Sequence, residues 1–184
     1  MIVENTIKQA VRDILAGIGE DPDRDGLRDT PDRIERMYAE LFAGIDRDPS
    51  EHLVATFEQD HDEMIVLRQV AFFSMCEHHL MPFFGHADIG YVPSDRIVGI
   101  SKLARVLEVL SRRPQIQERL TCQIADCIEG ALQPQGVAVR LVAEHLCMTM
   151  RGVQKPGSKM VTTVTRGVFR QNPATRGEFL DAVR

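Results

Sequence analysis

The sequence predicts an α+β fold with two layers, in which helices pack on a sheet. Three observations support this prediction. Apolar residues recur at helical spacing through most of the first 45 residues, and from residue 64 short β-prone runs begin. Beyond that point the order of elements is β-β-α-α-β-β, followed by a helix, and strands segregated from helices are typical of an α+β sandwich. We therefore divide the chain into an N-terminal helical region, residues 1–63, and a domain of residues 64–184.

The N-terminal region is expected to hold two helices. The first covers residues 4–18, where apolar side chains lie on one helical face. Residues 20–29 are rich in aspartate and glycine and are expected to form a loop. Thr30 and Pro31 mark the start of the second helix, because threonine caps a helix and proline fits its first turn. Residues 45–63 are polar and are expected to be irregular.

The domain of residues 64–184 is expected to form a four-stranded sheet covered by two helices. The predicted strands cover residues 64–73, 85–92, 137–143 and 160–169, and the predicted helices cover residues 101–112 and 114–132. Thr175 and Glu178 resemble a capping box that begins a short terminal helix. Because an open sheet leaves two unpaired edges, we expect these edges to pair with other subunits.

Composition excludes several classes of protein. At 43% hydrophobic and 27% charged residues, the chain is an ordinary globular sequence, without an apolar run of membrane-spanning length or a signal peptide. We therefore expect a cytoplasmic protein with no membrane partner. Four cysteines in 184 residues argue against a disulfide framework. Aromatic residues make up 5% of the chain and tryptophan is absent, so no nucleic-acid partner is expected.

Charge is divided unevenly along the chain. Residues 1–63 hold 17 of the 27 acidic and 7 of the 22 basic residues, a net charge of −10, whereas residues 64–184 carry +5. A basic domain with an acidic appendage is consistent with an anionic ligand or with contact between the two parts in an oligomer. A solvated acidic surface explains the same pattern equally well.

Two clusters of cysteine and histidine point to a metal site. Cys76 and His79 are separated by two residues, so a thiol and an imidazole can reach one ion from a short loop. A second cluster, E-H-L-C, lies some seventy residues further on and ends at Cys147. Zinc prefers mixed sulfur and nitrogen ligands in a tetrahedral arrangement. We therefore predict a catalytic zinc on Cys76, His79 and Cys147, with the fourth position open.

Two other interpretations of these residues stay open. Free cysteines are often core residues, and this is the interpretation we favour for Cys122 and Cys127, which lie on a predicted helix. A structural zinc would need a fourth protein ligand. The candidates for that ligand are His78, His145, Cys122 and Cys127.

His78 and His145 neighbour the predicted ligands and are candidates for proton transfer. An unperturbed imidazole has a pKa of about 6.5, so it can accept or release a proton near neutral pH. The alternative is that each histidine only orients the ligands. Glu77 and Glu144 are candidates for that supporting role.

Basic residues suggest an anion pocket beside the metal site. Ser101 and Lys102 stand at a predicted helix start, where free backbone N–H groups favour an anion. Arg105 shares a helical face with Lys102, and Arg151 follows the second cysteine cluster by four residues. Together they predict a polyphosphate pocket, although each alone fits a solvated surface charge.

Glu118, which follows Gln117 in the run R-P-Q-I-Q-E-R-L, could recognise a guanine. A carboxylate accepts two hydrogen bonds, which suits the N1–H and 2-amino groups of that base. The alternative is a surface ion pair with Arg113 or Arg119.

These motifs together resemble the GTP cyclohydrolase I family. The resemblance runs from about residue 30 to the C-terminus and is specific, because several motifs recur in order. They are C-E-H-H at 76–79, G-I-S-K-L-A-R at 99–105, R-P-Q-I-Q-E-R-L at 113–120, E-H-L-C-M-T-M-R-G at 144–152, and the T-R-G-E-F-L ending. Arg166 departs from the pattern, because an apolar or small residue is expected there.

The resemblance implies the tunnelling fold, in which sheets of several subunits join into barrels and two rings stack, usually as a decamer. It also implies active sites between subunits, with a basic residue of a neighbour on the phosphates, here carried over to Arg33. The implied reaction converts GTP and water to 7,8-dihydroneopterin triphosphate and formate, the first step of tetrahydrofolate and pterin synthesis.

The same resemblance assigns roles to the candidate residues. Zinc on its three ligands would activate water, His145 would protonate N7 of the guanine, and His78 would carry protons during formate release. Ser101 would lie near the sugar during an Amadori rearrangement. Glu118, helped by Gln117, would hold guanine. Lys102, Arg105 and Arg151 would hold the triphosphate.

Two rival functions remain open at this point. One is a related cyclohydrolase that stops at a different product and prefers iron(II). The other is a non-catalytic nucleotide- or pterin-binding assembly with a structural zinc.

Overall fold

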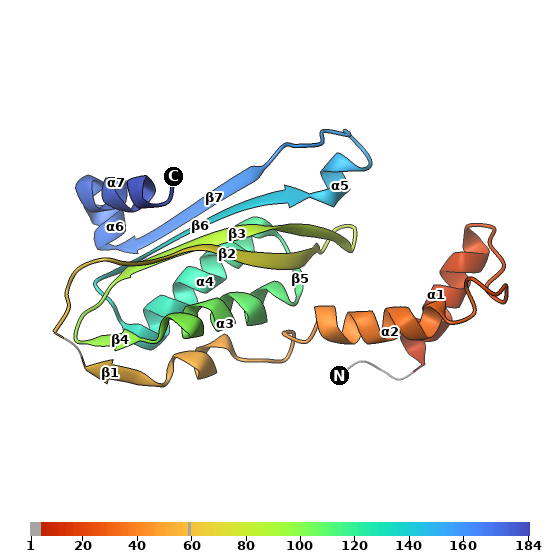
Figure 1. Cartoon of the computed structure of the whole chain (residues 1–184), viewed down its shortest axis with the longest axis horizontal. Helices are drawn as coiled ribbons and strands as arrows, with labels where there is room; N and C mark the ends of the chain where they lie inside the picture. The colour runs from red at the N-terminus through yellow and green to blue at the C-terminus, as the bar shows by residue number, and fades with distance from the viewer. Residues whose placement is uncertain (1–4, 59) are drawn as a thin grey trace.

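A computed structural model describes residues 5–58 and 60–184 and has the expected α+β architecture (Figure 1). Its main sheet has the strand order β5-β2-β3-β6-β7. The strands are β2 (Ile65–Cys76), β3 (Met81–Val92), β5 (Pro114–Gln115), β6 (Gly136–His145) and β7 (Met160–Gly167). The two long helices α3 (Ile100–Ser111) and α4 (Gln117–Leu132) lie side by side under one face of this curved sheet.

The core lies between that face of the sheet and the two helices. Side chains from both layers are almost completely buried there, and the removal of their apolar area from water stabilises the fold. They include Phe83, Ile89, Leu103, Leu107, Leu120, Ile124, Val139 and Leu141. Cys127 packs against this cluster, which confirms the prediction that it is a core residue.

The hairpin of β2 and β3 is longer than predicted, and this matters for the site. The sequence placed the strand ends at residues 73 and 85, but pairing continues to Cys76 and Met81. The predicted strand ends were wrong because the segment between them contains polar residues and a proline, which are typical of a loop. Pairing between β2 and β3 nevertheless keeps these residues in the sheet. The C-E-H-H motif therefore begins in the last residue of β2 and forms the turn of the hairpin.

The N-terminal helices α1 (Thr6–Gly17) and α2 (Thr30–Leu41) pack against each other and extend away from the sheet (Figure 1). The predicted start of the first helix, residue 4, lies outside the described residues. Asp29, rather than Thr30, occupies the N-cap of α2, and no side chain caps that helix. The division of the chain at residues 63 and 64 stays a prediction.

Parts of the segment 45–58 are more ordered than predicted. They contain the short 3-10 helix η1 (Pro49–Leu53) and strand β1 (Thr56–Glu58), which pairs antiparallel with β4 (Arg96–Val98). Leu53 is 2% exposed and belongs to the main core. Such a short segment carries no clear periodicity, so only its contacts with α3 and α4 identify it.

Two predicted helix starts were also wrong. Pro114 does not open a helix, because Pro114 and Gln115 form a parallel bridge to the end of β2, and α4 begins at Gln117. The terminal helix α7 (Pro173–Ala182) begins before Thr175. Asn172 caps it by accepting a hydrogen bond from the Ala174 backbone N–H at 2.9 Å.

The end of β7 explains the unexpected Arg166. The strand stops at Gly167, which has a φ of 54°, and the short helix α6 (Val168–Gln171) follows. Arg166 turns towards α4, where its guanidinium lies 2.8 Å from an Asp126 oxygen and 3.8 Å from a Glu129 oxygen. A cation is accommodated at this position because two carboxylates of the neighbouring helix face it.

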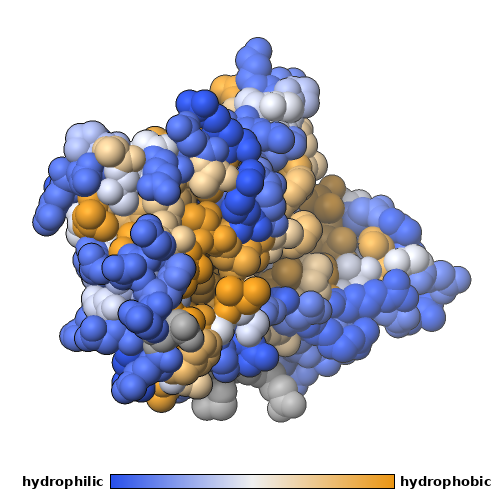
Figure 2. All heavy atoms as spheres, turned by 60° about the vertical axis from the view of Figure 1, so that its left-hand side comes forward, coloured by the Kyte–Doolittle hydropathy of each residue, from blue (hydrophilic) through white to orange (hydrophobic). Residues whose placement is uncertain are grey.

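Within the described part of the chain, no helix has the length and apolar character needed to span a membrane. Several large apolar side chains are nevertheless exposed, and Figure 2 shows apolar surface gathered in a hollow between polar flanks. The most exposed of these side chains are Val54, Ile18, Phe73, Val153, Met150 and Ile14.

Candidate metal centre

The hairpin turn and the end of β6 bring the predicted metal ligands together. Cys76 ends β2 and is 6% exposed, and His79 lies three residues later in the turn. Cys147 belongs to the short helix α5 (Leu146–Thr149), directly after β6. Strand β6 pairs with β3, so its end stands beside the hairpin. The donor atoms of Cys76, His79 and Cys147 all lie within 4.8 Å of one another.

The spacing of these atoms fits a shared metal ion. The two sulfurs are 4.0 Å apart, and the Cys76 sulfur lies 3.9 Å from His79 Nδ1. Two sulfurs bound tetrahedrally to zinc at about 2.3 Å would be about 3.8 Å apart. A disulfide would need about 2.05 Å, and all four cysteines are free. Two thiols and one imidazole could therefore hold a metal of the soft or borderline class.

The Cys147 thiol differs from an ordinary solvent-exposed cysteine. Burial and the neighbouring Cys76 raise the pKa of the Cys147 thiol, and Arg151 acts in the opposite direction. A metal must displace a proton from each thiol that it binds. Within residues 5–58 and 60–184, none of the four residues considered as a fourth ligand, His78, His145, Cys122 and Cys127, joins this group.

His145 stands next to the ligand group and is held from two directions. Its ring stacks on Phe83, its cross-strand partner, with centroids 4.6 Å apart and parallel planes. Its Nε2 lies 2.8 Å from Oε1 of Gln117. Burial lowers the pKa of His145, and the charge of Glu118 acts in the opposite direction. The ring of His145 is thus fixed in orientation.

The hairpin turn is tied to the first turn of α4. The carboxylate of Glu77 accepts hydrogen bonds from both terminal nitrogens of Arg119, one at 3.1 Å, and its pKa is lowered by this partner. The backbone N–H of Glu77 also donates to the Gln115 carbonyl at 3.0 Å. His78 is exposed, with Nδ1 4.0 Å from the Cys76 sulfur. The supporting role predicted for Glu77 thus has a structural basis.

The surface ion pairs that were considered for Glu118 are absent among the described residues. Arg119 bonds to Glu77, and Arg113 donates to the carbonyls of Gly44 and Arg47. Glu118 is exposed on the first turn of α4, close enough to influence His145 electrostatically.

Gln117, in contrast, faces inward. It is 0% exposed, and both of its side-chain polar atoms bond within the protein. The sequence does not reveal its link to His145, because the two residues are 28 positions apart and no local pattern joins them.

The predicted phosphate-binding residues fall into two groups. Arg151 belongs to the site, since its Nη1 lies 3.4 Å from His79 Nε2. Ser101, Lys102 and Arg105 lie in the first half of α3, whose other end contacts β2 through Ser111. Ser101 is therefore about 15 Å along the helix from that contact. One chain alone does not bring this group to the metal ligands.

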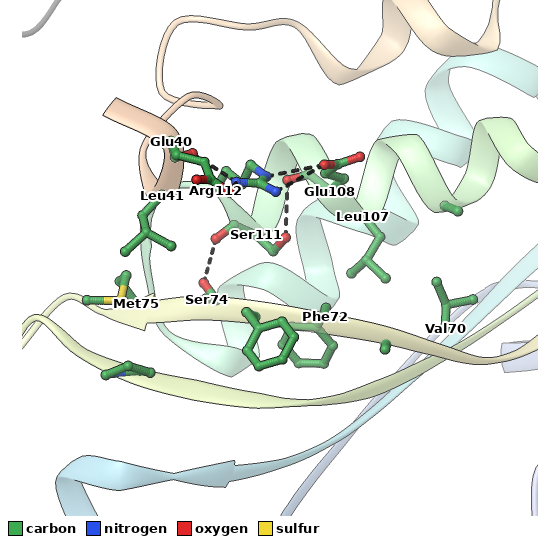
Figure 3. A pocket seen from close by; sticks show the side chains of 14 residues that line it. Glu40, Leu41, Val70, Phe72, Ser74, Met75, Leu107, Glu108, Ser111 and Arg112 are labelled. Carbon is green, nitrogen blue, oxygen red and sulfur yellow. Dashed lines mark hydrogen bonds and ion pairs between the residues drawn. The ribbon is translucent and has the colours of Figure 1, made fainter. Parts of the chain in front are cut away.

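Arg33 is also remote in a single chain. It lies near the start of α2, is exposed, and pairs with Asp29 at 3.4 Å. A separate cavity of about 420 Å³ lies between the end of α2, α3 and β2 (Figure 3), and it contains none of the predicted site residues. There Ser74 donates a hydrogen bond to the Ser111 carbonyl at 2.7 Å.

Comparison with known proteins identifies the family. The profile of the family described as GTP cyclohydrolase I matches residues 7–184. A protein named GTP cyclohydrolase 1 from Dehalococcoides mccartyi is 53% identical over 186 residues, covering 100% of this chain and 98% of the relative. The protein of that name from Carboxydothermus hydrogenoformans is 55% identical, with 97% and 93% covered. The one from Geobacillus kaustophilus is 54% identical, with 97% and 95% covered. The chain therefore belongs to the GTP cyclohydrolase I family of enzymes.

Proposed function

We propose that this chain hydrolyses GTP to 7,8-dihydroneopterin triphosphate and formate with the help of a bound zinc ion. One observation supports this above the others: the two motifs that match the family converge on Cys76, His79 and Cys147, with the fixed imidazole of His145 beside them. The same family membership supports a place in the cytoplasm, at the first step of tetrahydrofolate and pterin synthesis.

The three ligands would hold the ion and leave room for a water molecule. A zinc ion bound there would supply Lewis-acid activation of water at neutral pH. His145 would then deliver a proton to N7 of the guanine while the five-membered ring of the guanine opens. His78, exposed in the same turn, would carry protons while formate is released. Ser101 would stand near the ribose during the Amadori rearrangement that precedes ring closure.

Recognition of GTP would use charged residues at the surface. Glu118 is exposed and unpaired within the described chain, so its carboxylate is available to accept hydrogen bonds from the guanine N1–H and 2-amino groups. Arg151 is already beside the metal ligands and would bind the triphosphate there. We assign Gln117 to the support of this region rather than to a direct side-chain contact, because its polar atoms are occupied.

The remaining phosphate contacts would come from neighbouring chains. Lys102 and Arg105 lie along α3 and Arg33 lies on α2, all away from the metal ligands of their own chain. Assembly of sheets into barrels, and of two rings into a decamer, would bring these side chains to the metal ligands of another copy. The exposed apolar residues, the edge strand β7 and the part of β2 that the two-residue β5 leaves uncovered are consistent with such an assembly.

One incubation tests the proposal. The purified protein with GTP should release formate and give a product that becomes a fluorescent pterin on oxidation, and its mass should correspond to dihydroneopterin triphosphate. His145→Ala should abolish both signals while the zinc content stays the same. A product of different mass would indicate a related cyclohydrolase. GTP binding without formate would indicate a non-catalytic assembly, and either result would defeat the proposal.

A further inference from the structure

A buried network around Gln117 determines where its amide points. The amide nitrogen lies 3.2 Å from the Leu141 carbonyl, 3.1 Å from the Met160 carbonyl and 3.1 Å from the Thr162 hydroxyl. Carbonyl oxygens only accept hydrogen bonds, so the NH₂ end of the amide must face them. The opposite end, Oε1, therefore faces His145. The neighbours dictate this orientation, so it does not rest on an arbitrary assignment of the two amide atoms.

Two threonines complete the network and fix its hydrogens. The hydroxyl of Thr121 donates to the Gln117 backbone carbonyl at 2.7 Å, which uses its single hydrogen. Thr162 lies 2.7 Å from the same hydroxyl and must therefore be the donor of that pair. Thr162 then has only lone pairs to offer to the Gln117 amide, so it accepts. The two amide hydrogens of Gln117 thus face three acceptors, and Gln117 Oε1 is left as the acceptor on the opposite side.

The arrangement of donors and acceptors around Gln117 decides which nitrogen of His145 carries a hydrogen. Nε2 lies 2.8 Å from Oε1, and because Oε1 can only accept, Nε2 must donate. Parallel stacking on Phe83 prevents the ring from tilting out of this bond. Within residues 5–58 and 60–184, Nδ1 has no hydrogen-bond partner, and His145 is only partly buried. Nδ1 is thus the nitrogen open to a ligand.

We propose that Gln117 is a positioning residue that holds His145 as the Nε2–H tautomer and presents Nδ1 to the substrate. Gln117 would act through His145 and would not touch GTP through its side chain. The tautomer follows from the hydrogen-bond geometry of this chain alone. Its catalytic meaning rests on the proposed function.

The network suits repeated proton transfer. When His145 is protonated, both nitrogens carry hydrogen and Nε2–H still donates to Gln117. On transfer, the Nδ1–H bond breaks, its electron pair stays on Nδ1, and the proton passes to N7 of the guanine. The ring is then again the neutral Nε2–H tautomer, and neither the ring nor the amide has rotated. In serine proteases a buried carboxylate likewise holds the catalytic histidine in one tautomer.

The tautomer can be measured without any assay of turnover. We would prepare the zinc-loaded protein with ¹⁵N-labelled histidine and record side-chain nitrogen spectra by solid-state NMR, which suits a large assembly. The signals that His145→Asn removes belong to His145. We expect a protonated, pyrrole-type Nε2 and a pyridine-type Nδ1 in the neutral ring. A neutral ring with its hydrogen on Nδ1 would overturn the proposal, and this result needs no variant of Gln117.

A matched pair of variants then tests the role of Gln117. Gln117→Met keeps the length of the side chain and removes the acceptor, so His145 should become a mixture of tautomers. We expect kcat to fall about ten- to a hundredfold, with KM for GTP little changed. Gln123→Met changes another glutamine of α4, whose Oε1 accepts from Gln115 at 2.8 Å, and should leave the tautomer and kcat unchanged.

The outcomes separate this inference from the proposed function. An unchanged tautomer in Gln117→Met, with normal zinc content and thermal unfolding, would overturn the positioning role. If Gln117→Met does not fold, the spectrum of the unaltered protein still decides the tautomer. If the unaltered protein does not release formate from GTP, the proposed function fails, whereas the Nε2–H tautomer stands or falls by its own spectrum.

Discussion

Gly85 offers a sharp test of how the sheet positions the site. It lies on β3 opposite Ala143 of β6, two residues from the paired Phe83 and His145. A Cβ atom added at Gly85 would stand 1.9 Å from the Val142 carbonyl oxygen and 2.7 Å from the Ala143 Cα. Ordinary contacts begin at 3.4 Å, and the obstructing atoms are backbone rather than flexible side chains. In Gly85→Ala, β3 and β6 would therefore have to separate.

The cost can be worked out from what the separation breaks. Losing two backbone hydrogen bonds of the β3–β6 ladder removes about 1 kcal/mol each. Overpacking at a site that cannot relax adds about 1–3 kcal/mol. We expect Gly85→Ala to lower the free energy of unfolding by about 3–5 kcal/mol. Because β6 also carries His145 and leads to Cys147, the variant should bind less metal as well.

Gly130→Ala is the matched control, because it makes the same chemical change on the helix α4. Apart from its chain neighbours and the backbone of its own helix, nothing lies within 4 Å of a Cβ at that position. Alanine in a helix is favoured over glycine by about 1 kcal/mol, so this variant should be slightly more stable. Urea-induced unfolding, followed by circular dichroism at one protein concentration, measures both effects. Equal midpoints for Gly85→Ala and the unaltered protein would refute the steric argument, as would a destabilised Gly130→Ala.

Four further predictions concern the site. Cys147→Ser should lose bound metal and activity while far-ultraviolet circular dichroism stays unchanged, and retention of full metal content would contradict the assigned ligand set. Removal of metal by a chelator should abolish activity, and zinc but not magnesium should restore it because thiol ligands select the softer ion; recovery with magnesium would argue for a different site. Arg119→Met removes the partner of Glu77 and should weaken metal affinity about tenfold, measured by competition with a fluorescent chelator; an unchanged affinity would show that the hairpin turn needs no such tie. Mixed assemblies of His145→Ala and Lys102→Ala subunits should regain activity that neither has alone if sites are shared between chains, and mixtures that stay inactive would place both residues in one chain's site.

Much of the candidate site was predictable from sequence because the chemistry of its residues is local. Cys76 and His79 sit in four consecutive residues, and His145 and Cys147 in another four, so type and spacing identified them. The sequence also predicted the order of the long helices and strands, since periodicity over ten or more residues reports which face is buried. Short elements such as β1 and η1 were missed, because they exist only through contacts with β4, α3 and α4.

By itself, the sequence determined the family, the fold class and the chemical types at the site. Tertiary structure decided which of those residues meet. The bond of Gln117 to His145 spans 28 residues and that of Arg119 to Glu77 spans 42, and no local pattern encodes a partner so distant. The fold also separated Lys102 from the predicted metal ligands, because the length of α3 lies between them. The type and spacing of residues indicate which chemistry each side chain can perform. The path of the chain through the sheet decides which other residues lie close enough to take part.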